Sequence, residues 1–127
     1  MLKKLKEEIK TVSEEKFGKR KDASGPLNHL KEEIEELLDV LGKGGKEEED
    51  EWADCLLLLL DAWRIRYGNW PSYNHYIKMC LNKLEVVKSR KYDKKPDKDG
   101  IFRRDKNIEY IANSEIIDIN KLVEKYN

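Results

Sequence analysis

The sequence predicts an all-α protein, a four-helix bundle core followed by a C-terminal arm and a short terminal helix. Apolar residues recur three or four positions apart through most of residues 1–90, which is the period of an amphipathic helix. Glycine and proline fall between the periodic segments, and 127 residues suffice for one modest core. We therefore expect residues 1–127 to form a single domain, with the core over about 1–92 and a loop and C-terminal extension over 93–127.

The first two helices are predicted from their apolar stripes and their ends. The first ends near Phe17–Gly18 and carries its stripe at Leu2, Leu5, Ile9 and Val12. The second begins at Ser24–Pro26, because proline tolerates the first helical turn, and ends at Gly42. Its stripe consists of Leu27, Leu30, Ile34, Leu37, Leu38 and Leu41.

The third helix is predicted to begin within Lys46–Glu49, where acidic side chains favour the positive end of the helix dipole, and to end near Tyr67–Gly68. Its centre is apolar over much of its circumference, so we expect it to be the most buried helix. A fourth helix follows the turn at Ser72 and runs to about Lys88. Short connections between four such helices indicate a bundle.

The remaining residues lack a helical period up to residue 107. Tyr92–Lys106 mixes lysine, aspartate, proline and glycine, which predicts a loop or a partly ordered arm. We expect a short extended piece over Ile108–Ile111 and a capped helix that starts at Ser114. Nothing in residues 107–127 indicates a function beyond covering the bundle or contacting another subunit.

Charge is sorted strongly along this neutral chain. Glu32–Asp54 contains eleven carboxylates and two lysines, a local net charge of minus nine. Residues 83–106 contain ten lysines and arginines against five acids. An acidic segment and a basic segment together suit a ligand made of metal and phosphate. Because aspartates dilute the basic segment and the net charge is zero, nucleic acid is not expected as a partner.

Helical spacing gathers the acids into patches. Glu33 and Glu36 are one turn apart, as are Glu51 and Asp54, and Asp61 lies seven residues after Asp54. Antiparallel packing of the two helices can bring these patches face to face. Converging carboxylates either take up protons or bind cations, and oxygen ligands without histidine or cysteine select Mg²⁺, Mn²⁺ or Ca²⁺ over zinc.

A plainer interpretation also accounts for some of these acids, because a run of glutamates on a helix is usually a solvated face. Asp54 and Asp61 are less easily explained in that way, since they bracket six apolar residues on the helix expected to be most buried. A buried carboxylate is costly unless it is neutralised, paired or metal-bound. The residues alone leave these three alternatives open for Asp61.

The acidic motif resembles a family signature. Glu32, Glu33 and Glu36 form Glu-Glu-x-x-Glu, and after fourteen residues Glu51 and Asp54 form Glu-x-x-Asp. This pattern resembles the MazG-like, all-α nucleoside triphosphate pyrophosphohydrolases. Three segments, Pro26–Glu33, Ala53–Ala62 and Lys83–Arg90, make the chain similar to the dATP/dGTP pyrophosphohydrolase branch, many of whose members come from phages. The resemblance covers about residues 25–100.

The resemblance implies hydrolysis of a purine deoxynucleoside triphosphate to the monophosphate and pyrophosphate, with Mg²⁺ as cofactor and Mn²⁺ as a substitute. It implies four metal ligands, Glu33, Glu36, Glu51 and Asp54. Glu32 and Glu33 are the implied catalytic acids, with Glu32 assisting a metal or orienting the attacking water. Implied substrate contacts are Asp61, Lys83 and Arg90, the two cations neutralising phosphate charge.

His29 lies one turn before Glu33 and is a further candidate to reach the base or sugar, although a histidine on a helix surface is more often uninvolved. The large apolar faces and the family resemblance predict a homodimer or homotetramer. The N-terminus lacks an apolar secretion signal, and the longest apolar run is too short to span a bilayer. We therefore expect a cytoplasmic protein without a membrane partner.

Two rival functions follow from the same residues. One is the same fold acting on another triphosphate, such as dUTP or a modified nucleotide. The other is a non-catalytic helical interaction or nucleotide-sensing module whose acids only solvate its surface.

Overall fold

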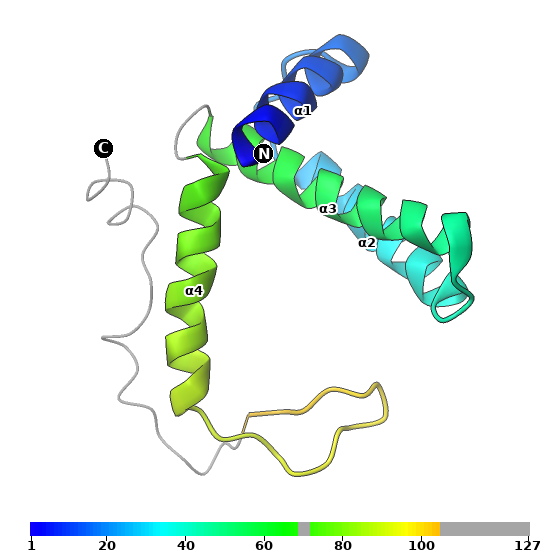
Figure 1. The fold of residues 1–127 in the computed structure, drawn as a ribbon, viewed down its shortest axis with the longest axis vertical. Coiled ribbons are helices and arrows are strands. Elements are labelled where there is room, and N and C mark those ends of the chain that lie inside the picture. Colours follow the sequence, from blue (N-terminus) through cyan, green and yellow to red (C-terminus); the bar gives the residue numbers. More distant parts are fainter. Residues whose placement is uncertain (69–71, 105–127) are drawn as a thin grey trace. The chain divides into compact units, whose positions relative to one another are not determined.

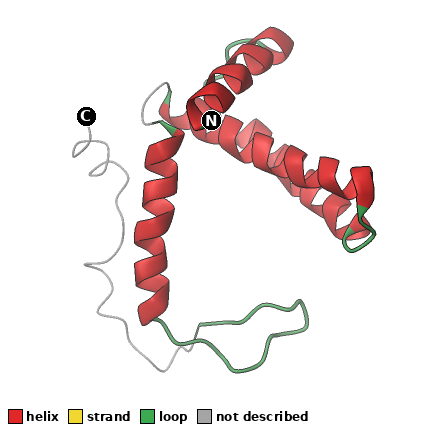
Figure 2. Cartoon of the chain, viewed as in Figure 1, coloured by secondary structure: helices red, strands yellow, loops and turns green. Residues whose placement is uncertain are grey.

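The computed structural model describes residues 1–68 and 72–104, which form four helices and no strand (Figure 2). The helices are α1 (Leu2–Phe17), α2 (Ser24–Val40), α3 (Gly45–Tyr67) and α4 (Tyr73–Ser89). The predicted all-α, four-helix fold is confirmed, with helix ends close to the predicted ones. The predicted extended piece at Ile108–Ile111 and the helix starting at Ser114 lie outside the described residues.

Contacts within the chain divide it into two units, Met1–Asn74 and His75–Asn127. The first unit contains α1, α2, α3 and the first residues of α4. Within it, α2 and α3 lie side by side as an antiparallel pair, and α1 packs against α3 (Figure 1). The prediction that residues 1–127 form a single domain stays a prediction, so each unit is described by itself.

The turn between α2 and α3 is built from glycines and one glutamate. Gly42, Gly44 and Gly45 have φ of 87°, 73° and 76°, a backbone region that favours glycine. The N–H groups of Gly42 and Gly44 donate to Glu48 Oε1 at 2.6 and 3.1 Å. The Trp52 indole N–H donates to Glu48 Oε2 at 3.3 Å. These three bonds lower the pKa of Glu48 and hold the turn to the first part of α3.

A buried polar network joins α1 to α3. The Asp61 carboxylate accepts hydrogen bonds from Ser13 Oγ at 2.9 Å and from Arg64 Nε and Nη2 at 3.0 and 2.9 Å. Arg20, which follows α1, also pairs with Asp61 and donates to Ser13. Asp61 is only 6 % exposed and Arg64 7 %. Because the buried charges neutralise one another, the network links the helices without leaving an unpaired ion.

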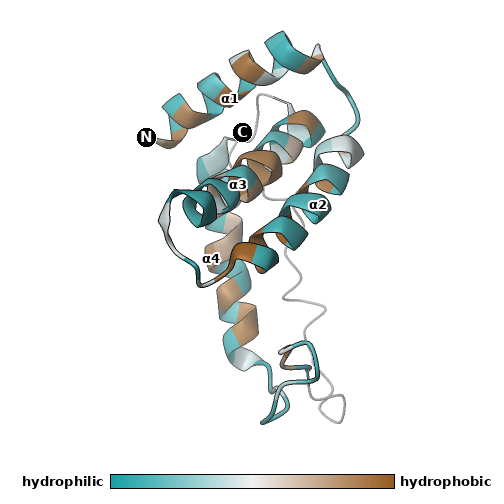
Figure 3. Cartoon of the chain, turned by 90° about the vertical axis from the view of Figure 1, so that its right-hand side faces the viewer, coloured by the Kyte–Doolittle hydropathy of each residue, from teal (hydrophilic) through white to brown (hydrophobic). Residues whose placement is uncertain are grey.

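The apolar core of the first unit lies where α1, α2 and α3 meet. Hydrophobic and hydrophilic residues are interspersed along these helices (Figure 3), as expected for amphipathic segments. The buried core residues of this unit are Ile9, Leu37, Val40, Leu60, Ala62, Trp63, Ile65 and Tyr73. The Tyr73 hydroxyl donates to the Leu60 carbonyl at 3.0 Å, which ties the beginning of α4 to α3.

The prediction that α3 is the most buried helix is confirmed, because it has more buried residues than α1 or α2, but its N-terminal half is less buried than its apolar centre suggested. Only Leu60–Ile65 is buried in α3, whereas Trp52 and Leu56 are 55 % and 53 % exposed. The polar network joins α1 to α3 at Asp61 and Arg64, in the C-terminal half of α3. The apolar side chains of the earlier turns, such as Trp52 and Leu56, therefore stay exposed. None of the described helices is both long enough and apolar enough to cross a bilayer.

The described part of the second unit is α4 from His75 onward and the segment after it. Val86 is buried, and Tyr92 and Arg104 form an isolated antiparallel bridge. Between them, Asp97 Oδ1 accepts the N–H groups of Asp99 and Ile101, both at 2.9 Å. The predicted loop is confirmed in residues 92–104, where Asp97 organises it.

The Asp61 network generates a stability prediction. The change Asp61→Ala leaves the buried Arg64 charge without its main partner, so the free energy of unfolding should fall by about 3–5 kcal/mol. Urea unfolding followed by circular dichroism measures this loss. The matched control is Asp39→Ala at an exposed position of α2, which should change stability by less than about 0.5 kcal/mol. Equal stability of the two variants would contradict a structural role for Asp61.

Candidate metal centre

Three carboxylates from two helices converge on one point. Glu33 and Glu36 lie one turn apart on α2, and Glu51 faces them from α3. One oxygen from each of the three groups lies within 4.8 Å of the other two. The spacing places two acids on one face of α2, and the antiparallel turn brings the beginning of α3 alongside. This confirms the predicted meeting of the two acidic patches for these three residues.

Crowding changes the electrostatics of the cluster. The pKa of Glu51 is raised to about 7, first because a proton shared with Glu33 favours its neutral form, then by desolvation and by repulsion from Glu33, Glu36 and Asp54. The pKa of Glu36 is also raised, chiefly by Glu33. Both shifts show that the charged forms repel one another.

Two oxygens of the cluster lack a hydrogen-bond donor. Glu33 Oε2 and Glu51 Oε2 are buried, and neither has a partner within residues 1–68 and 72–104. A buried carboxylate oxygen without a donor is costly unless a proton or a cation satisfies it. Carboxylate oxygens are the ligands that Mg²⁺, Mn²⁺ and Ca²⁺ prefer, so these residues fit a hard divalent cation.

The other two acids of the motif lie beside the cluster. Asp54 is exposed on α3, one turn after Glu51, and its charge contributes to the raised pKa of Glu51. It is not one of the three acids whose oxygens converge. Glu32 is exposed on α2, and its charge contributes to the raised pKa of Glu36. The predicted roles of both residues stay predictions.

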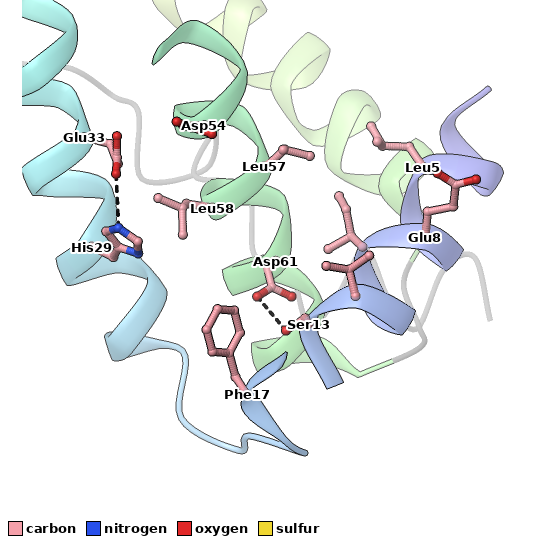
Figure 4. A pocket seen from close by; sticks show the side chains of 12 residues that line it. Leu5, Glu8, Ser13, Phe17, His29, Glu33, Asp54, Leu57, Leu58 and Asp61 are labelled. Carbon is pink, nitrogen blue, oxygen red and sulfur yellow. Dashed lines mark hydrogen bonds and ion pairs between the residues drawn. The ribbon is translucent and has the colours of Figure 1, made fainter. Parts of the chain in front are cut away.

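A cleft of about 390 Å³ runs from the acidic cluster towards α1 (Figure 4). Glu33 and Asp54 line it from α2 and α3, and His29 lines it one turn before Glu33. His29 Nε2 lies 3.1 Å from Glu33 Oε1, so His29 fixes one oxygen of Glu33 while the other stays without a donor. The predicted contact of His29 with the base or sugar of a substrate stays a prediction.

Asp61 also lines this cleft, but its carboxylate is occupied by the network with Ser13, Arg20 and Arg64. Of the three alternatives left open by the sequence, the structure selects pairing. Asp61 is therefore buried as a partner of arginines, and a substrate contact at this residue stays a prediction. The sequence analysis did not single out Ser13, Arg20 or Arg64. No spacing rule relates Ser13 and Arg20 to Asp61, because they are distant in the chain, whereas Arg64 lies one helical turn after Asp61 and its pairing could have been expected from that spacing.

Lys83 and Arg90 belong to the second unit. Lys83 is exposed on α4, and Arg90 directly follows that helix, where its N–H donates to the Val87 carbonyl at 3.1 Å. Their predicted role in neutralising phosphate charge stays a prediction.

The raised pKa of Glu51 predicts a pH-dependent stability in the absence of divalent ions. Because the folded state raises this pKa from 4.5 to about 7, protonation stabilises the fold at acid pH, and that contribution is lost as the pH rises through about 7. The change Glu51→Gln removes the charge at every pH. Its melting temperature in EDTA should therefore match the wild type near pH 5 and exceed it increasingly towards pH 8.

The matched control is Glu49→Gln, which removes a carboxylate at an exposed position of α3 outside the cluster. An offset of Glu51→Gln from the wild type that stays constant with pH would contradict the crowding of carboxylates in the cluster.

A family model described as dATP/dGTP pyrophosphohydrolase matches residues 5–114. That segment contains every residue of the acidic cluster and of the cleft. Comparisons with curated proteins and with solved structures gave no match.

Proposed function

This chain belongs to the dATP/dGTP pyrophosphohydrolase family, and from this premise we propose that it cleaves dATP or dGTP at the Glu33, Glu36 and Glu51 cluster with the help of Mg²⁺. The membership confirms the resemblance of its acidic motif and makes the chain a hydrolase of nucleoside triphosphates. The observation that carries the proposed site is the convergence of three carboxylates within 4.8 Å, two of which have a buried oxygen without a donor.

The proposed reaction is a hydrolysis at the α-phosphorus. A water oxygen forms the new bond to this phosphorus, and the bond from the phosphorus to the oxygen bridging the α- and β-phosphates breaks. Pyrophosphate leaves with that oxygen, and the water gives up its protons to the solvent or to a nearby base. No covalent intermediate on serine or cysteine is required.

Four acids would hold the divalent cation in this proposal: Glu33, Glu36, Glu51 and Asp54. A bound Mg²⁺ supplies Lewis-acid polarisation of phosphoryl oxygens and lowers the pKa of water. Mn²⁺ prefers the same oxygen ligands and would substitute. The shared cleft supports the inclusion of Asp54, because Asp54 and Glu33 line the same space.

The chain's own groups would orient and neutralise the reactants. Glu32 is exposed next to the cluster and would orient the attacking water or accept its proton. His29 orients Glu33 through the 3.1 Å contact at Oε1. Lys83 and Arg90 would neutralise phosphate charge, as the family resemblance implies.

The direct test is pyrophosphate release with Mg²⁺, measured across dATP, dGTP, dCTP, dTTP and dUTP. We expect the fastest release from a purine substrate and loss of release in EDTA, because the carboxylates alone cannot neutralise a triphosphate. Faster turnover of dUTP would favour the alternative in which the same fold acts on another triphosphate. Absence of pyrophosphate from every substrate would overturn it.

The same assay tests the acids. Glu36→Gln and Asp54→Asn should each lower turnover more than about 100-fold, since even the outer-shell partners of a metal contribute about 10–100-fold. The control is Glu35→Gln, an exposed neighbour on α2, which should retain activity. Circular dichroism should show an unchanged fold in all three variants, and undiminished activity in both Glu36→Gln and Asp54→Asn would refute the assignment.

We further propose that this chain forms a homodimer or homotetramer through an apolar face of α2 and α3. This face consists of large side chains that are 43–64 % exposed, Ile34, Leu38, Leu41, Trp52 and Leu56. Apolar patches of this kind commonly mark protein contacts, and a second copy presents the same face to a two-fold axis.

Size-exclusion chromatography with light scattering tests this assembly. We expect the mass of a dimer or tetramer for the wild type, and of a monomer for the double variant Leu38→Lys with Leu56→Lys, because two buried lysines would have no partner. The control pair Glu35→Lys with Glu49→Lys changes exposed positions of the same helices and should keep the wild-type mass. A monomeric wild type would contradict the proposal.

A further inference from the structure

Phe17 is an exposed aromatic residue that lies on the cleft. It is the last residue of α1, its side chain is 65 % exposed, and it lines the same cleft as Glu33 and Asp54. Figure 4 shows its ring extending from the end of α1 into the space between α2 and α3, on the side of His29 and Leu58.

The cleft has two chemically different parts. At one side it contains carboxylates of the proposed metal centre, Glu33 and Asp54. The rest of its wall contains six apolar side chains, Leu5, Ile9, Val12, Phe17, Leu57 and Leu58, together with the polar residues Glu8, Ser13, His29 and Asp61. A ligand that occupies the whole cleft therefore needs one end that binds a metal held by the carboxylates and another that is flat or apolar. A nucleotide has both, a phosphate end and a base.

We propose that the Phe17 ring is the stacking surface for the nucleobase of the substrate. This inference rests on the proposed function, because it requires the phosphates to lie at the Glu33, Glu36 and Glu51 cluster. The base then lies along the cleft beyond His29, in contact with Leu58 and with the ring of Phe17.

A neighbouring arginine limits which face of the ring is available. The Arg20 guanidinium carbon lies 4.8 Å from the centre of the Phe17 ring, within cation–π distance. Arg20 is itself held by Asp61 and Ser13, so the buried network supports the ring from one side. A base can then stack on the opposite face only.

Stacking on Phe17 favours a purine over a pyrimidine. The contact depends on overlapping ring area and not on base-edge hydrogen bonds, so it accepts adenine and guanine alike. A pyrimidine offers one ring instead of two and gains less from the same surface. The Phe17 ring thereby distinguishes base size and leaves the choice between the two purines to other groups.

The test compares Phe17→Ala, Phe17→Leu and Phe17→Trp in steady-state assays with dATP, dGTP and dCTP. Phe17→Ala and Phe17→Leu should raise KM for both purine substrates about ten-fold with little change in kcat, and should raise KM for dCTP less. Phe17→Trp keeps an aromatic face and should keep the low purine KM. Phe17→Leu is the matched control for apolar volume without a π face.

A second measurement separates stacking from a structural effect. The fluorescence of 2-aminopurine deoxyribonucleoside monophosphate falls when its base stacks, so wild type and Phe17→Trp with Mg²⁺ should quench it, and Phe17→Leu should not. Melting curves check that the exposed position tolerates each change. An active wild type with unchanged KM and quenching in Phe17→Ala and Phe17→Leu would overturn this inference alone. A wild type that releases no pyrophosphate would overturn the proposed function on which it rests.

Discussion

The antiparallel contact between α2 and α3 holds together carboxylates that repel one another. Glu33, Glu36 and Glu51 place one oxygen each within 4.8 Å, and the pKa of Glu51 rises to about 7 as a result. This arrangement opposes folding whenever the acids are charged and no cation is present. The rest of the first unit must therefore supply the packing that keeps α2 and α3 in register.

Two structural devices supply that packing at opposite ends of α3. At its beginning, Glu48 accepts the N–H groups of Gly42 and Gly44 and thereby fixes the turn that sets Glu51 against α2. In its C-terminal half, Asp61 joins Arg64 to Ser13 of α1 and to Arg20. The buried residues of α3 lie around this second device, and Leu37 and Val40 of α2 are buried close to the turn, so packing anchors the helix pair near both of its ends.

The carboxylates along the cleft also differ in their environments between the two ends of α3. Glu33 and Glu51, each with one oxygen that lacks a donor among the described residues, lie on the side of the α2–α3 turn, whereas the paired carboxylate of Asp61 lies beside α1. Two acids on one helix thus have opposite environments, one facing other acids and one facing arginines. Only the first kind fits a divalent cation, because the charge of Asp61 is already neutralised by protein groups.

How much of the fold and of the candidate site follows from the sequence depends on how far apart in the chain the interacting residues lie. Local rules were enough for the four helices, for their ends at Phe17 and Tyr67, and for the neighbourhood of His29 and Glu33, because these depend on residues within one or two turns. The acidic motif also indicated the cluster, since a short turn forces consecutive helices to lie antiparallel. The pairing of Asp61 with Ser13 and Arg20 was decided by the tertiary structure alone, because both residues are distant in the chain, whereas its pair with Arg64 spans one turn of α3. The position of Phe17 in the cleft and the exposure of Trp52 and Leu56 were decided in the same way, since periodicity shows which face of a helix is apolar but not which neighbour covers it.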